Sequence, residues 1–454
     1  MKMISSIIFI ILLVATAVIF IRRIREIRYN INLGRAKDLS GNVGERLRIM
    51  ARVALGQSKL ITRPVAGIMH VFIYIGFIII NVEILEIVTD GALGTHRAFH
   101  AFLGDEIYYV FIGLFEILAL LVLIACVTFL IRRNVGRIKR FSGKEMTKWP
   151  TSDANIILVI EVLLMLAFLT MNAADTVLMT APTDMLMSTG MDHYLGFNFG
   201  DWFWVSAYLT GLMPNNIETL FLIERFCWWF HIVGVFGFSI YVLYSKHFHI
   251  FIAFPNTYYS RLNSMGELPN LEAVKKEVEL MMDPSADPYA APAENAEPPQ
   301  RFGAKDIEDL SWKQLMDAYS CTECGRCTSE CPANQTGKLL SPRKIMMDTR
   351  DRVEELGKHR RANGKEASDE ISLLGNYITK EELWACTTCN ACVQACPVNI
   401  DPLSIIVDLR RFLVMEESAA PSELNTMFTN VENNGAPWQF AQADRGNWTN
   451  ELSS

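Results

Sequence analysis

The chain has 454 residues, enough for two or three domains, and 51% of them are hydrophobic. The hydrophobic residues are concentrated in the first 255 positions, which predicts a membrane half followed by a soluble half. A formal net charge of −7 gives no sign of a nucleic-acid partner. Eight of the ten cysteines fall in two short runs, a pattern that indicates metal binding rather than disulfides.

Five apolar segments approach the roughly 20 residues that a helix needs to cross a bilayer. They are residues 4–21, 65–88, 107–131, 154–179 and 221–245. The first segment also has a feature of a secretory signal, because the ATA at 15–17 resembles a cleavage site. The apolar run continues past this triplet and a basic cluster, RRIREIR, follows it, so a retained transmembrane anchor is the favoured interpretation.

Charges in the connecting segments predict the orientation of these spans, because Lys and Arg accumulate on the cytoplasmic side. Segment 22–63 has eleven basic and three acidic residues, and segment 132–149 has seven and one. Segment 89–106 contains a single arginine, and segment 182–220 contains no Lys or Arg. We therefore expect a multi-pass protein of the cytoplasmic (inner) membrane, with its N-terminus outside and the cysteine-containing region after residue 250 in the cytoplasm.

Three histidines of the membrane half, His70, His231 and His249, are candidate axial ligands of haem b. Imidazole is costly in hydrocarbon unless it is bonded, and b-type haem iron takes two axial nitrogens. A separation of 18 residues would place His231 and His249 on one helix face about 27 Å apart, as two stacked haems require. His70 is expected level with His249. The alternative is that these imidazoles are interfacial or hydrogen-bonded and hold no haem.

The partner of His231 is less well defined, because the second span has Ile80 where another ligand would be needed. His96, with His100 as a substitute, is the predicted ligand if the apolar stretch ALGTHRAFHAFLG folds back into the outer leaflet. His193 is a weaker candidate. One or two haems are therefore expected.

Carboxylates inside the spans are functional candidates, because a charged group in the bilayer is costly. Glu116 and Glu161 lie farther inside their predicted spans than the other carboxylates. A quinol site needs a proton acceptor at the quinol hydroxyl groups. These two are the candidate quinone-site residues. Pairing of each with a polar group of a neighbouring span is an equal alternative.

The soluble half begins with a predicted linker, residues 256–304, in which DPSADPYAAPAENAEPPQ is rich in Pro, Ala and acidic residues. The helical patterns SWKQLMDAYSC and KEELWACTTC each lead into a cysteine run within residues 305–411. Residues 412–454 form a tail that we expect to dock a partner protein. The predicted fold class is all-α: a five-helix transmembrane bundle, residues 1–255, followed by a small, mainly helical ferredoxin-like domain.

The two cysteine runs, CTECGRCTSECP and CTTCNACVQACP, share the spacing C-x2-C-x2-C-x3-C-P. Three closely spaced thiolates of such a run hold one [4Fe-4S] cluster, and the fourth cysteine, followed by Pro, ligates the other cluster. The ligands predicted for the first cluster are Cys321, Cys324, Cys327 and Cys396. Those predicted for the second are Cys386, Cys389, Cys392 and Cys331. Structural zinc is the alternative, but zinc ribbons pair their cysteines and lack this run.

Spans two to five, with His231 and His249 eighteen residues apart and YSKHFH at the end, resemble the cytochrome b subunit of respiratory nitrate reductase and the membrane subunit of heterodisulfide reductase. The resemblance implies that His70, His231 and His249 ligate haem b and that a quinol or its analogue reacts in the membrane. Ile80 departs from the nitrate reductase pattern. The cysteine domain and the tail segments NNGAPW and DRGNW resemble heterodisulfide-reductase-like iron–sulfur proteins, whose Cys-Cys-Gly catalytic modules are missing here.

The predicted function is electron transfer between a membrane quinone, haem b and two [4Fe-4S] clusters, to or from a separate cytoplasmic, cysteine-rich catalytic subunit. No cysteine follows Cys396, so the catalytic chemistry is expected on that other polypeptide. The alternative is a redox sensor, or a membrane anchor of a larger complex, that carries the clusters without quinone turnover. A self-sufficient thiol or disulfide enzyme is disfavoured, since the eight clustered cysteines are committed and no G-x-G-x-x-G nucleotide fingerprint is present.

Overall fold

The computed structural model describes residues 2–136, 138–189, 191, 194–195, 202–285 and 301–452. Within these ranges the regular secondary structure is helical, apart from two isolated β-bridges, Arg35 with Ser311 and Leu374 with Ile378. The all-α fold predicted from the sequence is thus confirmed. His193 and residues 286–300 of the predicted linker lie outside the described residues.

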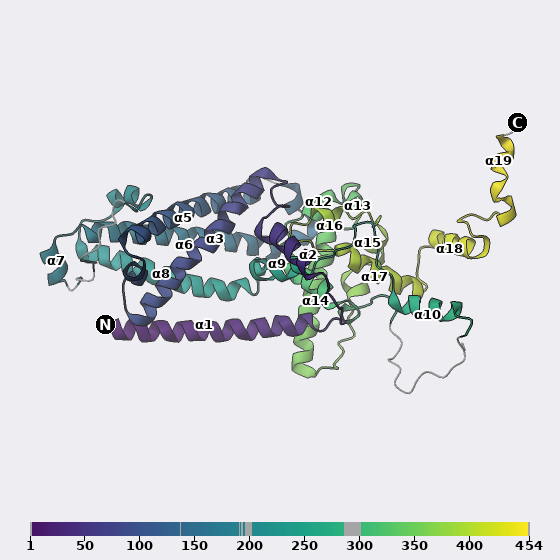
Figure 1. The fold of residues 1–454 in the computed structure, drawn as a ribbon, viewed down its shortest axis with the longest axis horizontal. Coiled ribbons are helices and arrows are strands. Elements are labelled where there is room, and N and C mark those ends of the chain that lie inside the picture. Colours follow the sequence, from purple (N-terminus) through teal and green to yellow (C-terminus); the bar gives the residue numbers. More distant parts are fainter. Residues whose placement is uncertain are drawn as a thin grey trace.

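Five long apolar helices form a bundle that occupies one half of the molecule (Figure 1). They are α1 (Lys2–Ile31), α3 (Pro64–Leu93), α5 (Asp105–Asn134), α6 (Trp149–Met179) and α8 (Ile217–Val242). Each is long and apolar enough to cross a bilayer, as the sequence predicts. Helix α6 lies between α5 and α8, α3 packs on α5, and α1 packs on α3 and α8.

Helix α1 lies at the edge of the bundle, and one buried aromatic side chain packs it against α3 and α8. Phe9 is fully buried, and its ring centroid lies 5.9 Å from that of Trp228 and 5.7 Å from that of Phe236, both on α8. On the other side, Gly91 of α3 makes room for the ring, since a Cβ there would lie 2.6 Å from the Phe9 ring atoms. The close approach of α1 and α3 therefore requires glycine at this position.

Short helices connect the long ones. On the side of the soluble half they are α2 (Val43–Met50), η1 (Ala51–Leu55), η2 (Lys139–Phe141) and η3 (Lys144–Met146). At the opposite end of the bundle they are α4 (Ala98–Leu103), α7 (Thr183–Ser188) and η6 (Ser206–Leu212).

The fifth long helix ends before His249, which corrects one sequence-based expectation. Helix α8 stops at Val242, and Ser245 has extended backbone angles (φ −116°, ψ 159°) while its hydroxyl accepts a hydrogen bond from the backbone N–H of His247. A short turn, η7 (Lys246–Phe248), and a new helix, α9 (His249–Tyr258), follow. His231 and His249 therefore do not share one helix face, and the estimate of five helical turns between them does not apply. The expected domain boundary at residue 255 falls inside α9.

The soluble half is built from short helices around two loops that carry the cysteines. Its elements are α10 (Glu272–Met282), η8 (Ile307–Asp309), α11 (Trp312–Ser320), α12 (Arg326–Glu330), α13 (Pro332–Gln335), α14 (Pro342–Asn363), η9 (Leu373–Tyr377), α15 (Lys380–Trp384), α16 (Ala391–Ala395) and α17 (Pro402–Met415). Helices α11 and α15 each begin with a capping box, which fixes the entrance to a cysteine loop. Helices α12 and α16, inside the two loops, pack against each other.

The tail continues as α18 (Ser422–Asn434), η10 (Gln442–Gly446) and α19 (Trp448–Glu451) and projects away from the body of the molecule (Figure 1). Helix α17 runs to Met415, and its Phe412 and Leu413 are buried in the soluble domain. The expected start of the tail at residue 412 thus lies within a packed helix.

The two halves share one hydrophobic core. Ile27 of α1, Leu243 and Phe248 belong to the same buried cluster as the core of the cysteine domain. Polar contacts across the junction add to it: Arg343 of α14, 1% exposed, forms an ion pair of 2.7 Å with Glu145 of η3. The cysteine domain is therefore packed against the end of the bundle rather than suspended on a flexible tether.

Candidate metal centres

The two cysteine runs fold into loops with the same backbone course. In the first loop Glu323 and Gly325 have positive φ angles of 55° and 70°. The equivalent residues of the second loop, Thr388 and Asn390, have φ angles of 56° and 60°. Such left-handed residues turn the chain sharply, so that the three cysteines of one run can surround a common centre.

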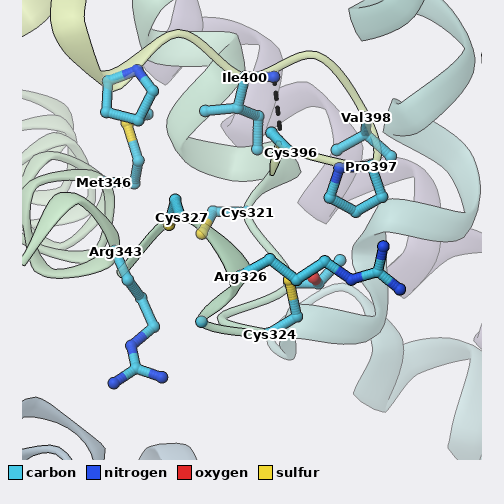
Figure 2. A pocket seen from close by; sticks show the side chains of 13 residues that line it. Cys321, Cys324, Arg326, Cys327, Arg343, Met346, Cys396, Pro397, Val398 and Ile400 are labelled. Carbon is cyan, nitrogen blue, oxygen red and sulfur yellow. Dashed lines mark hydrogen bonds between the residues drawn. The ribbon is translucent and has the colours of Figure 1, made fainter. Parts of the chain in front are cut away.

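Four cysteines line one cavity at the junction of the two loops (Figure 2). They are Cys321, Cys324, Cys327 and Cys396. The backbone N–H of Ile400 donates a hydrogen bond to Sγ of Cys396, at 3.3 Å, and Met346 closes another wall of the cavity. This is the ligand set that the sequence predicts for the first cluster, with its fourth member supplied by the second run. The donor set fits a [4Fe-4S] cluster, which takes four thiolates.

The other four predicted ligands also lie close together. Burial raises the pKa of Cys386, and the nearby thiolates of Cys331 and Cys389 raise it further. Burial raises the pKa of Cys392 as well, with added contributions from Cys386 and Cys331. Cys331, from the first run, is thus within electrostatic reach of Cys386 and Cys392 of the second run. Cys389 is exposed to solvent, whereas the thiol of Cys392 is buried.

Burial favours the protonated thiols of Cys321 and Cys396 in the first cavity when no metal is bound. It raises the pKa of Cys321 to about 11 and that of Cys396 to about 12. Metal–sulfur bonds form with thiolates, so a bound cluster would displace these protons and favour the folded loops.

Two of the three candidate haem histidines lie next to each other. The ring centroids of His70, on α3, and His249, at the start of α9, are 6.3 Å apart. Two imidazole nitrogens on opposite sides of one metal ion lie about 4 Å apart, since each bond is about 2 Å long, and this places the ring centroids about 6 Å apart. Nδ1 of His249 donates to the backbone oxygen of Lys246 at 3.1 Å in the tautomer that leaves Nε2 free as a ligand. Nδ1 of His70 is buried and has no hydrogen-bond partner in the described part of the chain. The pair fits bis-histidine haem b.

His231 lies elsewhere in the bundle, and the structure does not bring its predicted partners to it. Its Nδ1 is 3.0 Å from the backbone oxygen of Leu164 on α6. His96 packs on Tyr194, with ring centroids 5.1 Å apart, and Tyr194 belongs to the same buried cluster as Leu220. Leu220 precedes His231 by eleven residues in α8, so these two residues lie about 16 Å apart along the helix axis.

His100 contacts residues of α5 near the same end of the bundle as His96. Its Nε2 lies 2.9 Å from Oδ1 of Asp105, and its ring packs on Tyr108. The prediction that His96 or His100 completes an outer haem with His231 is therefore not supported by the geometry, because the loop folds onto α5 and the end of the bundle.

Hydrogen bonds link the histidine pair to the first cysteine loop. Lys246 makes both contacts. Its backbone oxygen accepts a hydrogen bond from His249, and its side-chain Nζ donates to the Glu323 carboxylate. Glu323 lies between Cys321 and Cys324 and is only 4% exposed. Although burial works to raise the pKa of Glu323, the charges of Arg350 and Lys246 lower it below the usual value.

A second attachment holds the same loop to the segment before α3. Arg326, which lines the cavity, donates to the backbone oxygen of Lys59 at 2.9 Å and to that of Leu60 at 3.0 Å. Leu60 lies four residues before the start of α3, the helix that carries His70. Both histidine-bearing segments are thus fixed to the first cysteine loop.

The two candidate quinone-site carboxylates have different surroundings. Glu116 is fully buried and accepts four hydrogen bonds, from the backbone N–H groups of Val205 and Ser206, the Ser206 hydroxyl and the Asn172 amide. It therefore fixes η6 to the bundle. Glu161, near the middle of α6, is partly exposed on the bundle surface, and no described residue forms a hydrogen bond or ion pair with it.

Sequence reasoning missed a buried polar network at the end of the bundle remote from the cysteines. Its centre is Arg97, 6% exposed, which donates to Asp175 at 2.7 Å and to Asn172 at 3.0 Å. The carboxylates around it on α3 are Glu83, Glu86 and Asp90. The available signal was that Arg97 is the only Lys or Arg in segment 89–106, which contains three acidic residues.

Comparisons with known proteins agree with this architecture. Residues 320–400 match the family model described as a 4Fe-4S dicluster domain. The chain is 28% identical over 477 residues to the "Probable iron-sulfur-binding oxidoreductase FadF" of Bacillus subtilis, an alignment that covers 98% of this chain and 61% of that protein. It is 29% identical over 420 residues to the "EtfAB:quinone oxidoreductase" of Syntrophomonas wolfei, covering 88% of this chain and 53% of that protein.

A shorter similarity concerns the cysteine domain. The chain is 36% identical over 119 residues to one subunit of the ferredoxin/F(420)H(2)-dependent CoB-CoM heterodisulfide reductase of Methanosarcina acetivorans, which covers 26% of this chain and 60% of that protein. No solved structure matches the chain. The described part of the chain thus combines five helices long and apolar enough to cross a membrane with a 4Fe-4S dicluster domain, and the chain is similar to FadF and to EtfAB:quinone oxidoreductase. It spans between about half and three-fifths of the length of these two relatives.

Proposed function

We propose that the chain carries electrons between a membrane quinone and a soluble, cysteine-rich catalytic partner, by way of haem b and two [4Fe-4S] clusters. The name of one relative, EtfAB:quinone oxidoreductase, supports a quinone as one redox partner. The name of another, a heterodisulfide reductase subunit, supports membership of a multi-subunit complex.

The observation that carries the proposal is the direct connection between the histidine pair and the first cysteine cavity. His249 is bonded to the backbone of Lys246, and the Lys246 side chain is bonded to Glu323, between two cavity cysteines. When bound, haem and a [4Fe-4S] cluster each supply a site that takes up or releases one electron. Residues bonded in series hold such sites at a fixed separation, which efficient electron transfer requires.

The surroundings of the two loops support an order for the electron carriers. The first cysteine loop lies against the membrane half through Glu323 and Arg326. In the second loop Cys389 is exposed. We infer the order haem, first cluster, second cluster, soluble partner, and the direction of electron flow follows from the potentials of the two end partners.

Glu161 is the proposed proton-accepting residue at the quinone. Oxidation of a quinol releases two electrons and two protons, so the site needs a group that takes protons from the hydroxyls. Glu161 is partly exposed and forms no hydrogen bond or ion pair with a described residue, whereas Glu116 accepts four hydrogen bonds. Glu161→Gln should slow reduction by quinol while reduction by dithionite stays unchanged.

The soluble partner is proposed to dock near the tail. Trp438, Phe440 and Trp448 are 52%, 65% and 65% exposed, respectively. Large exposed aromatic side chains are enriched in the centres of protein interfaces. Removal of residues after Glu416 should therefore abolish binding of the partner and leave the metal centres in place.

The decisive test is a redox-difference optical spectrum of the purified membrane protein, recorded before and after addition of a reduced quinol analogue. Haem b bands that appear with quinol would support the proposal. If no haem bands appear even with dithionite, the histidines are structural and the cluster-carrying anchor or sensor becomes the better description.

Variants then assign the ligands. His249→Ala should lose the haem bands, because one of the two axial nitrogens is removed, and should keep the cluster absorbance. His96→Ala is the matched control and should keep both, since His96 lies with Tyr194 at the far end of the bundle. Full haem content in His249→Ala would contradict the ligand assignment.

A further inference from the structure

A groove lies where the first transmembrane helix meets the cysteine domain. Its α1 side is formed by Val18, Ile21, Arg22, Arg25, Glu26 and Tyr29, and its other side by Arg361 of α14. Helix α14 crosses the C-terminal end of α1 (Figure 1). The groove is therefore the corner between a helix that crosses the membrane and a helix that lies beyond its surface.

The apolar-to-polar boundary of α1 runs through this groove. The side chains before it are apolar and exposed, and Val18 and Ile21, which line the groove, are 61% and 49% exposed. From Arg22 onward α1 continues as a helix outside the apolar zone as far as Ile31. Acyl chains would contact Val18 and Ile21, and a lipid headgroup would lie level with the arginines.

The polar part of the groove carries uncompensated positive charge. The Arg22 side chain is 83% exposed and reaches Glu26 only at 3.6 Å. Glu26 is already paired with Arg23, at 3.2 Å, on the buried side of α1. Arg25 forms no hydrogen bond or ion pair with any described residue, and it is exposed. Three guanidinium groups, those of Arg22, Arg25 and Arg361, thus face one carboxylate that is engaged elsewhere.

Arg361 is held in place for such a role. It donates to the side-chain oxygen of Asn30, and its guanidinium lies 5.8 Å from the centroid of the Tyr29 ring. A guanidinium fixed by these contacts still has free N–H groups, which suit the bidentate binding of phosphate oxygens.

We propose that this groove binds the phosphate headgroup of an anionic phospholipid, with the acyl chains along Val18 and Ile21 of α1. The phosphate would pair with Arg22 and Arg25 on the membrane helix and with Arg361 on the cysteine domain. Because one headgroup contacts both halves, the lipid adds to the attachment of the cysteine domain at the membrane surface.

The test is native mass spectrometry of the delipidated full-length chain, titrated in detergent with phosphatidylglycerol, with phosphatidylcholine or with inorganic phosphate. One phosphatidylglycerol should bind at least about tenfold more tightly than phosphatidylcholine. Each arginine near an anionic headgroup contributes about fivefold, so R22Q/R25Q should weaken phosphatidylglycerol binding about 25-fold. R28Q, on the same helix but outside the groove, is the matched control and should change it little.

Three results would overturn the proposal. Equal weakening by R28Q and R22Q/R25Q would mean general attraction to a basic helix end. Equal binding of phosphatidylcholine would mean that the headgroup charge is not recognised. Displacement of phosphatidylglycerol by inorganic phosphate at the same concentration would identify a site for soluble phosphate. Retention of the cluster absorbance in each variant verifies folding, and it is expected because the substituted arginines are exposed.

Discussion

The two cysteine loops have the same spacing and the same backbone turns but opposite surroundings. In the first loop Glu323 and Arg326 are 4% and 5% exposed and contact the membrane half. In the second loop Cys389 is exposed. The first loop therefore lies at the membrane junction, and the second has a cysteine that is open to solvent.

The difference arises from the residues between the cysteines. Glu323 and Arg326 of the first run stand where the second run has Thr388 and Ala391. The cysteines fix the local fold of each loop, and the two intervening charges fix which loop is held against the bundle. The two copies of the cysteine motif thus differ in their contacts with the bundle because of side chains that are not metal ligands.

The largest expected effects come from removing the crossed fourth cysteine of each site. Cys396→Ser and Cys331→Ser should each lose about half of the bound iron, because each removes a ligand from one of two clusters. In Cys396→Ser the cluster at the membrane junction is lost, so quinol should reduce the haem only. In Cys331→Ser the first cluster should remain reducible by quinol. Low-temperature electron paramagnetic resonance of the quinol-reduced variants measures this, and the opposite assignment would contradict crossed ligation.

The exposure of Cys389 predicts unequal loss of iron. Ferricyanide with an iron chelator should bleach the cluster absorbance in two phases, the faster from the second site, because solvent reaches an exposed ligand first. In Cys331→Ser, which lacks that site, the fast phase should vanish. A single phase in the unmodified protein would mean that both clusters are equally protected.

The link between the first loop and the membrane half can be broken with Lys246→Met. Lys246 and Glu323 are 9% and 3% exposed in their side chains, and a buried charge left without a partner costs about 3–5 kcal/mol. Because Arg350 still pairs with Glu323 at 2.8 Å in the variant, the loss of stability should be smaller than this. The variant should transfer electrons from haem to cluster more slowly and lose its clusters at lower denaturant concentration. Lys344→Met is the control, since Lys344 pairs with Glu382 beside the second loop, at 2.9 Å and with a 30% exposed side chain. An equal effect on electron transfer in both variants would contradict the special role of the junction.

The cysteine spacing was sufficient to predict a 4Fe-4S dicluster domain, because the run encodes its own local geometry. The division of the eight cysteines between two clusters stays a prediction, although four of them line one cavity. Hydropathy was likewise sufficient for the five long helices. Both signals are local, with every informative residue within one segment. The neighbouring positions of His70 and His249 could be anticipated for the same reason, since depth in a span follows from sequence.

The interior of the bundle could not be predicted, because it depends on which helix faces meet. Glu116 was predicted to be a functional carboxylate because it lies inside a span. In the structure it accepts hydrogen bonds from the backbone N–H groups of Val205 and Ser206. His96 was expected beside His231, but the loop that carries it folds so that Arg97 enters the bundle instead and pairs with Asp175. Such contacts join residues 78 to 90 positions apart, and the periodicity of the sequence does not predict them.

The smallest predicted effect is a pH dependence located in the cysteine domain, on α14. Burial raises the pKa of Asp348 to about 6, from the ordinary value of 3.8, in spite of the nearby Lys344. The folded state therefore binds this proton more tightly than the unfolded state, and the stabilisation is present at low pH and lost as pH rises through 6. This rise in pKa corresponds to about 3 kcal/mol in total, of which about 1 kcal/mol is lost between pH 5 and pH 7.

Asp348→Asn removes the titrating group, so its denaturation midpoint should fall less than that of the unmodified protein over this pH interval. The cluster absorbance during urea denaturation provides the measurement. Because Asp348 lies beside Lys344 and Glu382 at the second loop, the effect should be seen in the loss of the second cluster before the first. If the denaturation midpoint of the variant depends on pH as that of the unmodified protein does, another group causes the pH dependence. The two loops would then not differ in the pH dependence of their stability through Asp348.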